Sequence, residues 1–534
     1  MANAARPSSA LDPRAGDLSH VRSTPLLSGL QLAEVLLALS ASVLVAYRFG
    51  ATQAADAFFM GQAVLLLFTK FLQSGPMANM FFPVYLRVKQ EGGKEAAWSL
   101  FCNLLWTLAL VMTFLAVLLI WAGDLVVALI APGFDAGTQA LTARVARVLF
   151  ATVVTLPLST LFTSLLHARG FFVVPGVLAL IPPAAYLGAA AWGAGRYGIL
   201  ALPWGILVGA FVHLAALALA VRWELGLPWH WRLDWHQHEL RKFVRQVVAF
   251  NLVVPFAQAQ LFVSRLLLSL LPVGSVALIG YAERLAGHLN LLYAVPTTFL
   301  PAVTRRLVRD GREEFRRFLA VNLNVANLVF FPLSLGVMIL SPDLVKLIFE
   351  RGAFDSKASG VLSVILILFM IGLLVQGMAN LFSRSLYALD RSADVIKARI
   401  LVNIVTVAAY LVILMSPSLY GLALIMGLGP VMFWFAYFWF LSRQVEGMVT
   451  LVFNGSLRRI ALSAAMMAMA LLASRGLDSV GGPSGNSLLI LVVSSVLGLV
   501  VYGTCLILLR ISEVVVVKEY VRSRLPVAWG RGAA

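Results

Sequence analysis

The sequence predicts an all-α polytopic membrane protein of about 14 transmembrane helices. Two parallel six-helix lobes are expected around a central cavity, with two further helices at the C-terminal end. Of the 534 residues, 60% are hydrophobic and only 12% are charged, about half the charged share of a soluble domain. Apolar runs of about 20 residues, long enough to cross a bilayer, recur along the chain. Short motifs of the first half also return in the second half, as in a duplicated lobe.

The predicted spans leave no room for a sizeable soluble domain between them. They lie at residues 26–47, 55–82, 97–121, 141–166, 172–192, 198–221, 246–271, 274–300, 318–340, 359–388, 398–415, 420–441, 458–474 and 487–509. The polar, Pro- and Ser-containing start predicts a disordered tail. The predicted parts are a cytoplasmic tail at 1–25, an N-lobe at 26–221, a cytoplasmic linker at 222–245, a C-lobe at 246–441, the last two spans within 442–509, and a cytoplasmic tail at 510–534.

Basic residues are divided unequally between the two sides of this topology. With the N-terminus in the cytoplasm, 29 of the 41 Lys and Arg residues fall in cytoplasmic loops and tails, and 8 fall on the opposite side. Because positively charged loops stay in the cytoplasm, both termini are predicted to be cytoplasmic. The same bias explains the net charge of +17, since the basic clusters lie between spans and face anionic lipid headgroups. Nucleic-acid binding is therefore not expected.

An internal repeat relates the two predicted lobes. Three motif pairs recur at nearly one spacing: Pro83 with Pro301, Asp124 with Asp343, and Leu161 with Leu381, at offsets of 218, 219 and 220 residues. A Gly-Phe-Asp motif at 133–135 likewise returns as Gly-Ala-Phe-Asp at 352–355. Six spans separate the copies, so both have the same orientation in the membrane. Substrate sites of such transporters lie between the two lobes.

The eighth span, within Val273–Arg306, carries the most informative charges. Glu283, Arg284 and His288 lie near its middle, although a charge at bilayer depth costs about 2.5–3.5 kcal/mol. One helical face gathers small and polar residues: Gly280, Arg284, Gly287 and His288. This face predicts either a polar cavity or a partner for Arg284, the acidic candidates being Asp56, Glu34 and Glu283.

Further ionisable residues lie in other predicted spans. They are Glu34 in the first, Asp56 and Lys70 in the second, Arg265 in the seventh and Arg384 near the inner end of the tenth. Each has a structural alternative to a functional role. Lys70 and Arg384 can extend to the interface, Arg265 can pair within its own lobe, and Asp56 can cap the start of its own span.

No catalytic constellation stands out in the sequence. There is no phosphate-binding Walker loop, no H-E-x-x-H motif and no nucleophile elbow, and the two cysteines give neither a disulfide framework nor metal spacing. We therefore expect a transporter rather than an enzyme, with no catalytic residue, no metal site and no cofactor. Whether sodium or protons serve as a coupling cation stays open.

Several motifs resemble the MurJ/MviN family of lipid II flippases. The stretch GSVALIGYAERL (Gly274–Leu285), followed by LPAV (Leu300–Val303), is similar to the signature of the family's eighth span. Other matching stretches are FGATQAADAFF (Phe49–Phe59), FFPV (Phe81–Val84), LIAPGF (Leu129–Phe134), LIFERGAFD (Leu347–Asp355) and SLYALDRSADVIK (Ser385–Lys397). The resemblance runs from about residue 26 to about residue 443.

This resemblance implies a transporter of the multidrug/oligosaccharidyl-lipid/polysaccharide exporter superfamily. A central cationic cavity would take the diphosphate and sugar of a polyprenyl-linked precursor, and the last two spans would form a groove for its lipid tail. Alternating access would carry the headgroup to the outer face of the bacterial inner membrane. The expected substrate contacts are Arg284, Lys70, Arg265 and His288, and the expected gating or ion-coupling residues are Asp56, Glu34 and Glu283.

The sequence also departs from the family pattern. The family's first span usually carries two arginines, the second followed by an acidic residue, and the corresponding positions here look like Val35, Ala41 and Ser42. The family's paired arginines of the second span correspond to Thr69-Lys70, its Glu-Gly to Ser74-Gly75, and its Asp before the seventh-span arginine to Ser264. A diphosphate binds best where several cations converge in a dry cavity, so fewer cations place more weight on Arg284 and Lys70.

Two other functions stay open at this point. An ion-coupled drug or metabolite antiporter of the same superfamily would use Glu34, Asp56 and Glu283 for its coupling ion. A non-transporting envelope-assembly scaffold would account for the missing arginines. For the leading hypothesis the expected partners are a polyprenyl-linked saccharide, the lipid bilayer and envelope-synthesis glycosyltransferases, with the protein itself a monomer.

Overall fold

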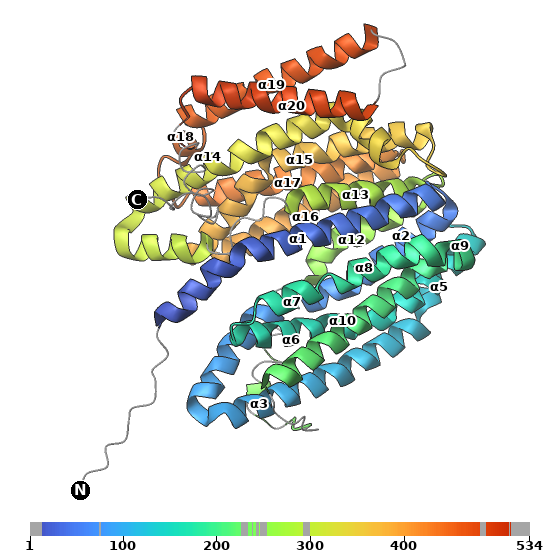
Figure 1. Cartoon of the computed structure of the whole chain (residues 1–534), viewed down its shortest axis with the longest axis vertical. Helices are drawn as coiled ribbons and strands as arrows, with labels where there is room; N and C mark the ends of the chain where they lie inside the picture. Colours follow the sequence, from blue (N-terminus) through green and yellow to red (C-terminus); the bar gives the residue numbers. More distant parts are fainter. Residues whose placement is uncertain are drawn as a thin grey trace, which may run out of the picture. The chain divides into compact units, whose positions relative to one another are not determined.

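The computed structural model describes residues 13–73, 76–225, 254–291, 299–480 and 487–511, together with 233–235, 237, 239–241, 245 and 513. Within these residues every regular element is a helix (Figure 1). Ten helical segments there are long and apolar enough to cross a membrane. The predicted all-α membrane fold is therefore confirmed. The predictions for 1–12, Ser74-Gly75, 514–534 and half of the linker 222–245 lie outside the described residues.

The helices follow the predicted order of spans. In the first half they are α1 (Pro13–Phe49), α2 (Gln53–Gln73), α3 (Pro76–Trp121), α4 (Gly123–Ile130), α5 (Ala136–Phe150), α6 (Thr155–Ala168), α7 (Val173–Leu178), α8 (Ile181–Gly188), α9 (Ala194–Tyr197) and α10 (Ala201–Leu225). In the second half they are α12 (Val254–Ser269), α13 (Ser275–Leu291), α14 (Phe299–Phe349), α15 (Ser356–Ala388), α16 (Ser392–Leu414), α17 (Leu419–Ser442), α18 (Met448–Val452), α19 (Gly455–Val480) and α20 (Ser487–Leu508).

The ten long segments account for most of the predicted spans. One of them, Val173–Glu224, covers two predicted spans, and α2, α12 and α13 supply three more that are shorter in the described residues. The predicted count of about 14 is therefore approximately matched.

Two helix boundaries differ from the prediction. The first span was expected to begin at residue 26 after a disordered tail, but the helix α1 already covers the described residues from Pro13 onward, and the fixed φ of proline suits the first turn of a helix. The charged segment before the ninth span was expected to be a loop, but it belongs to the continuous helix α14. This segment is rich in Arg and Glu, which favour helix, and Glu313 pairs with Arg316 one turn later at 3.0 Å.

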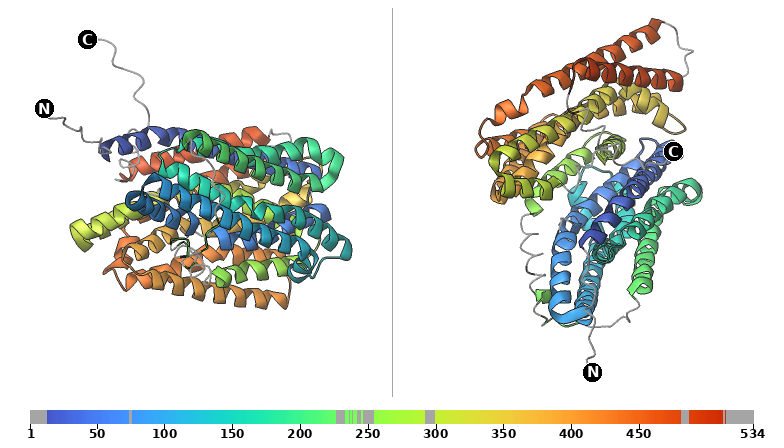
Figure 2. Two further views of the ribbon diagram at one scale, coloured as in Figure 1. Left: turned by 90° about the horizontal axis from the view of Figure 1, so that it is seen from below. Right: turned by 60° about the vertical axis from the view of Figure 1, so that its left-hand side comes forward.

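The chain divides into two compact units. Unit 1 comprises 1–44, 61–127 and 140–255, and unit 2 comprises 45–60, 128–139 and 256–534. In unit 1, α10 packs beside α6 and α8, and α3 packs beside α6. In unit 2, α15 packs between α14 and α17, α13 lies against α15, and α16 lies against α17. The pair α19 and α20 packs along α14, as the right-hand view of Figure 2 shows.

Asn103 of α3 holds part of the linker within unit 1. Its side-chain amide donates to the Asp234 carbonyl at 2.8 Å and to Gln237 Oε1 at 2.6 Å, and its Oδ1 accepts from the Asp234 N–H at 3.0 Å. Asn103 is 1% exposed. An amide that both donates to and accepts from one residue imitates a backbone pairing, so this segment of the linker is fixed to α3.

The internal repeat is visible in two equivalent helix starts. Asp135 lies directly before α5, and its Oδ2 accepts from the Thr138 N–H at 3.1 Å. Asp355 lies directly before α15, and its Oδ1 accepts from the Ala358 N–H at 2.8 Å. Hydrogen bonds from the Thr138 hydroxyl and N–H lower the pKa of Asp135 below its usual value. Both copies of the Gly-Phe-Asp motif therefore end in a helix cap.

Candidate functional site

The two glycines on the predicted polar face of α13, Gly280 and Gly287, differ in how closely other residues approach them. A Cβ built on Gly280 would lie 2.3 Å from the Phe59 ring, so the missing side chain makes room for that ring. A Cβ on Gly287 would have no heavy atom within 4 Å among the described residues, and Gly287 is exposed. The face is thus packed at Gly280 and open to space at Gly287, two turns further along.

Arg284 lies between these two positions. Its guanidinium carbon is 4.8 Å from the centroid of the Phe59 ring and 5.8 Å from that of Phe58. Such a cation–π contact contributes about 0.5–2 kcal/mol. Of the acidic partners considered for Arg284, Glu283 and Asp56 have their carboxylates bound elsewhere, as described next.

Arg265 and Glu283 form a buried ion pair within unit 2. Arg265 Nη2 donates to both carboxylate oxygens of Glu283, at 2.6 and 2.7 Å. The Arg265 side chain is 4% exposed and that of Glu283 is 35% exposed. Tyr410 shares a hydrogen bond with Gln260 beside this pair. The pairing of Arg265 within its own half of the chain is the structural alternative weighed for it above.

Asp56 caps α13 and not its own helix. Its Oδ2 accepts from the Gly274 N–H at 2.6 Å and its Oδ1 accepts from the Ala277 N–H at 2.7 Å, with the residue only 3% exposed. A carboxylate at a helix N-terminus meets both the unpaired N–H groups and the positive end of the helix dipole. Asp56 therefore joins the start of α2 to the start of α13.

Further contacts close the same end of unit 2. The Tyr281 hydroxyl donates to the Gly50 carbonyl at 3.1 Å, and the Ala353 N–H donates to the Tyr47 carbonyl at 2.8 Å. Tyr281 also packs its ring on Phe59, with centroids 4.8 Å apart. We call this set the α2–α13 closure: Tyr47, Gly50, Asp56, Phe59, Gly274, Ala277, Tyr281 and Ala353.

Gly274 permits the close approach of chains in the α2–α13 closure. Its φ of 91° is a conformation that favours glycine, and a Cβ there would lie 2.6 Å from the Ala51 carbonyl oxygen. The turn before α13 can therefore lie directly against the turn before α2.

The remaining predicted residues have different surroundings. Glu34 is exposed on α1, and Lys70 lies in α2 with its side chain outside the described residues. Both belong to unit 1, whereas Asp56, Arg265, Glu283 and Arg284 come together in unit 2. His288 is half-buried, and its Nδ1 has no hydrogen-bond partner in the described part of the chain. No group of three metal-ligating His, Cys, Asp or Glu side chains occurs among those residues either.

The sequence did not point to Phe59, Tyr281 or the Gly274 turn as functional residues. Phe59 and Tyr281 are apolar enough to pass for core residues of their spans. One available signal was the Gly280 position, because a glycine inside a helix commonly marks a close approach.

Comparison with known proteins places this chain in a family. The family model described as "Lipid II flippase MurJ" matches residues 45–493. The lipid II flippase MurJ of Burkholderia cenocepacia is 26% identical over 420 residues, which are 76% of this chain and 81% of the relative. A probable lipid II flippase MurJ of Helicobacter pylori strain J99 is 25% identical over 397 residues, 70% of this chain and 85% of the relative.

Solved structures show the same fold. A lipid II flippase MurJ in an inward closed conformation superposes with a TM-score of 0.75 at 19% identity, over 91% of this chain and 99% of that one. A multidrug resistance MATE family transporter in an inward-facing conformation has a TM-score of 0.64 at 14% identity, over 79% and 96% of the two chains. Since the family model spans most of the sequence, the chain belongs to the lipid II flippase MurJ family.

Proposed function

We propose that this protein is a flippase. It moves a polyprenyl-diphosphate-linked saccharide, lipid II or a related cell-envelope precursor, from the cytoplasmic to the outer leaflet by alternating access. The observation that carries this proposal is Arg284, a cation in the middle of an apolar helix, beside the open face at Gly287. A cation at that depth is costly and commonly marks a substrate pathway, and the relatives' names supply an anionic cargo in lipid II.

The α2–α13 closure acts as the outer gate in this proposal. The predicted topology places the starts of α2 and α13 at the outer face, so the closure seals that side while the headgroup enters from the cytoplasm. Asp56 is the main gating residue because its two charge-assisted hydrogen bonds hold the gate shut. Glu34 takes part in the same cycle from the first span.

Arg284 and Lys70 contact the phosphates of the headgroup. Arg265 assists indirectly, since its guanidinium is held by Glu283, the residue next to Arg284 in the chain. His288, one turn beyond Arg284 on the same face, adds a hydrogen bond to phosphate or sugar. With the first-span arginines absent, these residues carry most of the headgroup recognition.

The protein works as a transporter without catalysis in the bacterial inner membrane, with both termini in the cytoplasm. We propose that it is a monomer that receives its cargo from envelope-synthesis glycosyltransferases. Sodium or protons are candidates for a coupling cation. A drug or metabolite antiporter is the competing function, because the fold is shared with a MATE family transporter.

Native mass spectrometry of the purified protein tests this function. A co-purifying polyprenyl-diphosphate saccharide is expected on the wild type and is expected to be lost in Arg284→Ala. The matched control is Arg147→Ala, an arginine of unit 1 paired with Asp124. Only phospholipid on all three proteins, together with drug resistance conferred on cells, would support the antiporter instead.

A further inference from the structure

The helix pair α19–α20 is packed on α14 largely through apolar contacts. Buried residues of the three helices form one cluster: Leu328, Leu340, Ile460, Ala464, Met467, Leu471, Tyr502, Leu506 and Ile511. The opposite face of the pair is exposed, with Leu472 and Val496 among its large apolar side chains. Apolar packing is non-directional, so it leaves the register of α19 along α14 to be set by other contacts.

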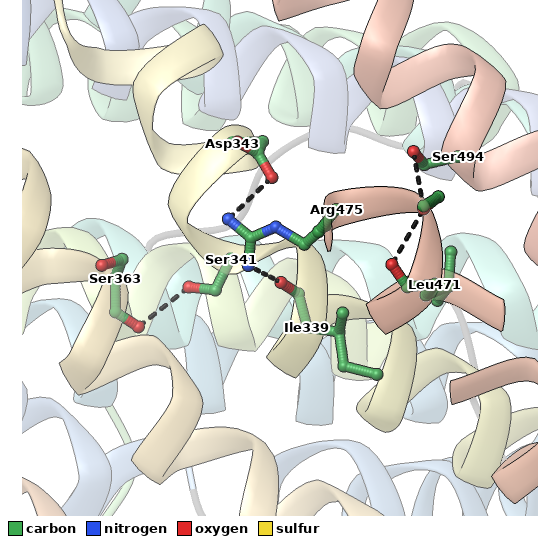
Figure 3. A network of polar contacts seen from close by, with 8 residues as sticks. Ile339, Ser341, Asp343, Ser363, Leu471, Arg475 and Ser494 are labelled. Atoms are coloured by element: carbon green, nitrogen blue, oxygen red, sulfur yellow. Dashed lines mark hydrogen bonds and ion pairs between the residues drawn. The ribbon is translucent and has the colours of Figure 1, made fainter. Parts of the chain in front are cut away.

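Arg475 supplies such a contact near the end of α19 (Figure 3). Its Nη2 lies 3.0 Å from Asp343 Oδ2, and its Nη1 donates to the Ile339 carbonyl at 2.6 Å. Both acceptors belong to α14, one turn apart. A planar guanidinium that bridges two acceptors fixes orientation as well as distance.

The internal repeat allows the partner of Asp343 to be compared with the partner of its equivalent in the first repeat. Asp124, the first-repeat equivalent of Asp343, pairs with Arg147 of α5. Counting on from Arg147 by the repeat offsets of 219 and 220 residues leads to Leu366 and Ile367. The second repeat thus carries no arginine at the equivalent position, and Asp343 is paired with an arginine from outside the repeat.

Other polar contacts fasten the helix pair further along α14. Asn324 Nδ2 donates to Glu513 Oε1 at 2.7 Å, and the Tyr502 hydroxyl donates to the Leu328 carbonyl at 2.8 Å. Between the two helices, the Ser474 and Ser494 hydroxyls lie 3.2 Å apart. Arg475 therefore completes a row of fixed points that runs from Asn324 to Asp343.

We propose that Arg475 is a positioning residue that takes the role Arg147 has in the first repeat and sets the register of α19–α20 on α14. The helix pair then moves with α14 as one body. The family resemblance implies that the last two spans form a groove for the lipid tail. On the proposed function, the Arg475–Asp343 contact therefore fixes where that groove lies relative to the rest of unit 2.

Register is measured first by disulfide formation, which requires no transport. A Cβ on Gly336 would lie 3.8 Å from Met467 Cε, the end of that side chain, so the two positions face each other, and transient approach of Gly336→Cys to Met467→Cys follows the observed register. Gly336→Cys with Leu471→Cys reports a shift by one turn. Both pairs are made in a Cys102→Ala/Cys505→Ala background. The first pair is expected to form its disulfide faster than the second. Adding Arg475→Gln is expected to lower the ratio of these two rates about three- to tenfold.

Matched variants distinguish positioning from general stability. Arg147→Gln removes the equivalent ion pair of unit 1 and is expected to leave the ratio of the two oxidation rates unchanged. The double reversal Asp343→Arg/Arg475→Asp is expected to restore part of the rate ratio that Arg475→Gln lowers. An unchanged ratio in Arg475→Gln, or an equal change in Arg147→Gln, overturns the proposal.

Transport then tests the consequence for the cargo. Arg475→Gln is expected to slow a full-length polyprenyl substrate more than a short-chain analogue with the same headgroup, whereas Arg147→Gln affects both equally. An equal loss for both substrates in Arg475→Gln contradicts the role of this contact in placing the groove. If the wild type moves neither substrate, the proposed function fails while the disulfide ratio still decides on the register.

Discussion

The guanidinium of Arg284 lies over the Phe59 ring at 4.8 Å, and the same ring fills the space left by Gly280. The cation proposed to bind phosphate therefore touches a side chain of the α2–α13 closure. On the proposed function, a diphosphate that draws Arg284 away from Phe59 takes away a contact to a residue of the closure. The proposed phosphate contact and the proposed gate therefore share one aromatic ring, that of Phe59.

Two glycine substitutions test this linkage. Gly280→Ala places a methyl group where the Phe59 ring lies, so we expect it to weaken the closure by about 1–3 kcal/mol. Gly287→Ala is the control, because no described heavy atom lies within 4 Å of its Cβ position. The measurement is the labelling rate of Ala277→Cys, a buried position of the closure, which should rise only in Gly280→Ala. Equal rates in both variants would contradict the packing role of Phe59.

Asp56→Asn should open the closure further. The neutral amide keeps at most one acceptor for the two N–H groups of α13 and loses the attraction to the helix dipole, a change of about 1.5–3 kcal/mol. Labelling of Ala277→Cys is expected to be about 10- to 100-fold faster at this free-energy change. Asp124→Asn, whose side chain is 72% exposed, is the control and should have little effect. Unchanged labelling in Asp56→Asn would remove Asp56 from the gate.

The Arg265–Glu283 pair gives a prediction about stability. Glu283→Leu leaves the 4%-exposed Arg265 without its counter-ion, so thermal stability in detergent should fall by the equivalent of about 3–5 kcal/mol. The double variant Arg265→Met/Glu283→Leu should regain most of this loss, since no charge is then left buried. A double variant as unstable as the single one would show that the pair has no such coupling.

Asn103→Ala should release the linker. The variant loses three hydrogen bonds to Asp234 and Gln237, so tryptic cleavage near Arg241 and Arg245 should become about tenfold faster. Asn403→Ala is the matched control, because the Asn403 amide donates within its own helix, to the Arg399 carbonyl. Equal cleavage of both variants would indicate that Asn103 does not hold the linker.

Composition and hydropathy were sufficient to predict the membrane fold, because each span must satisfy its own backbone in lipid and therefore reads as a long apolar helix. The repeat was also visible, since Asp135 and Asp355 keep the same capping role. The charged start of α14 is helical, whereas the sequence predicted a loop there. Its charges indicate exposure to water but not the backbone conformation, and Arg and Glu favour helix.

Pairing between distant residues could not be read from the sequence. Asp56 was a candidate cap for its own span, yet it caps α13, 218 residues further along at Gly274. The sequence indicates only that Arg475 is a basic residue on the predicted outer side and that Asp343 repeats Asp124. It does not indicate that Arg475 and Asp343 form an ion pair. Such contacts depend on how helices cross, and no local propensity or spacing encodes them.

Transport of lipid II across the bilayer of reconstituted vesicles tests the central claim most directly. A fluorescent lipid II, placed in the leaflet that corresponds to the cytoplasm, becomes accessible to an impermeant quencher on the other side only if it is flipped. We predict transfer by the wild type and by Gly287→Ala, and no transfer above empty vesicles by Arg284→Ala. Full transfer by Arg284→Ala, or none by a folded wild type under a membrane potential and sodium or proton gradients, would contradict the account.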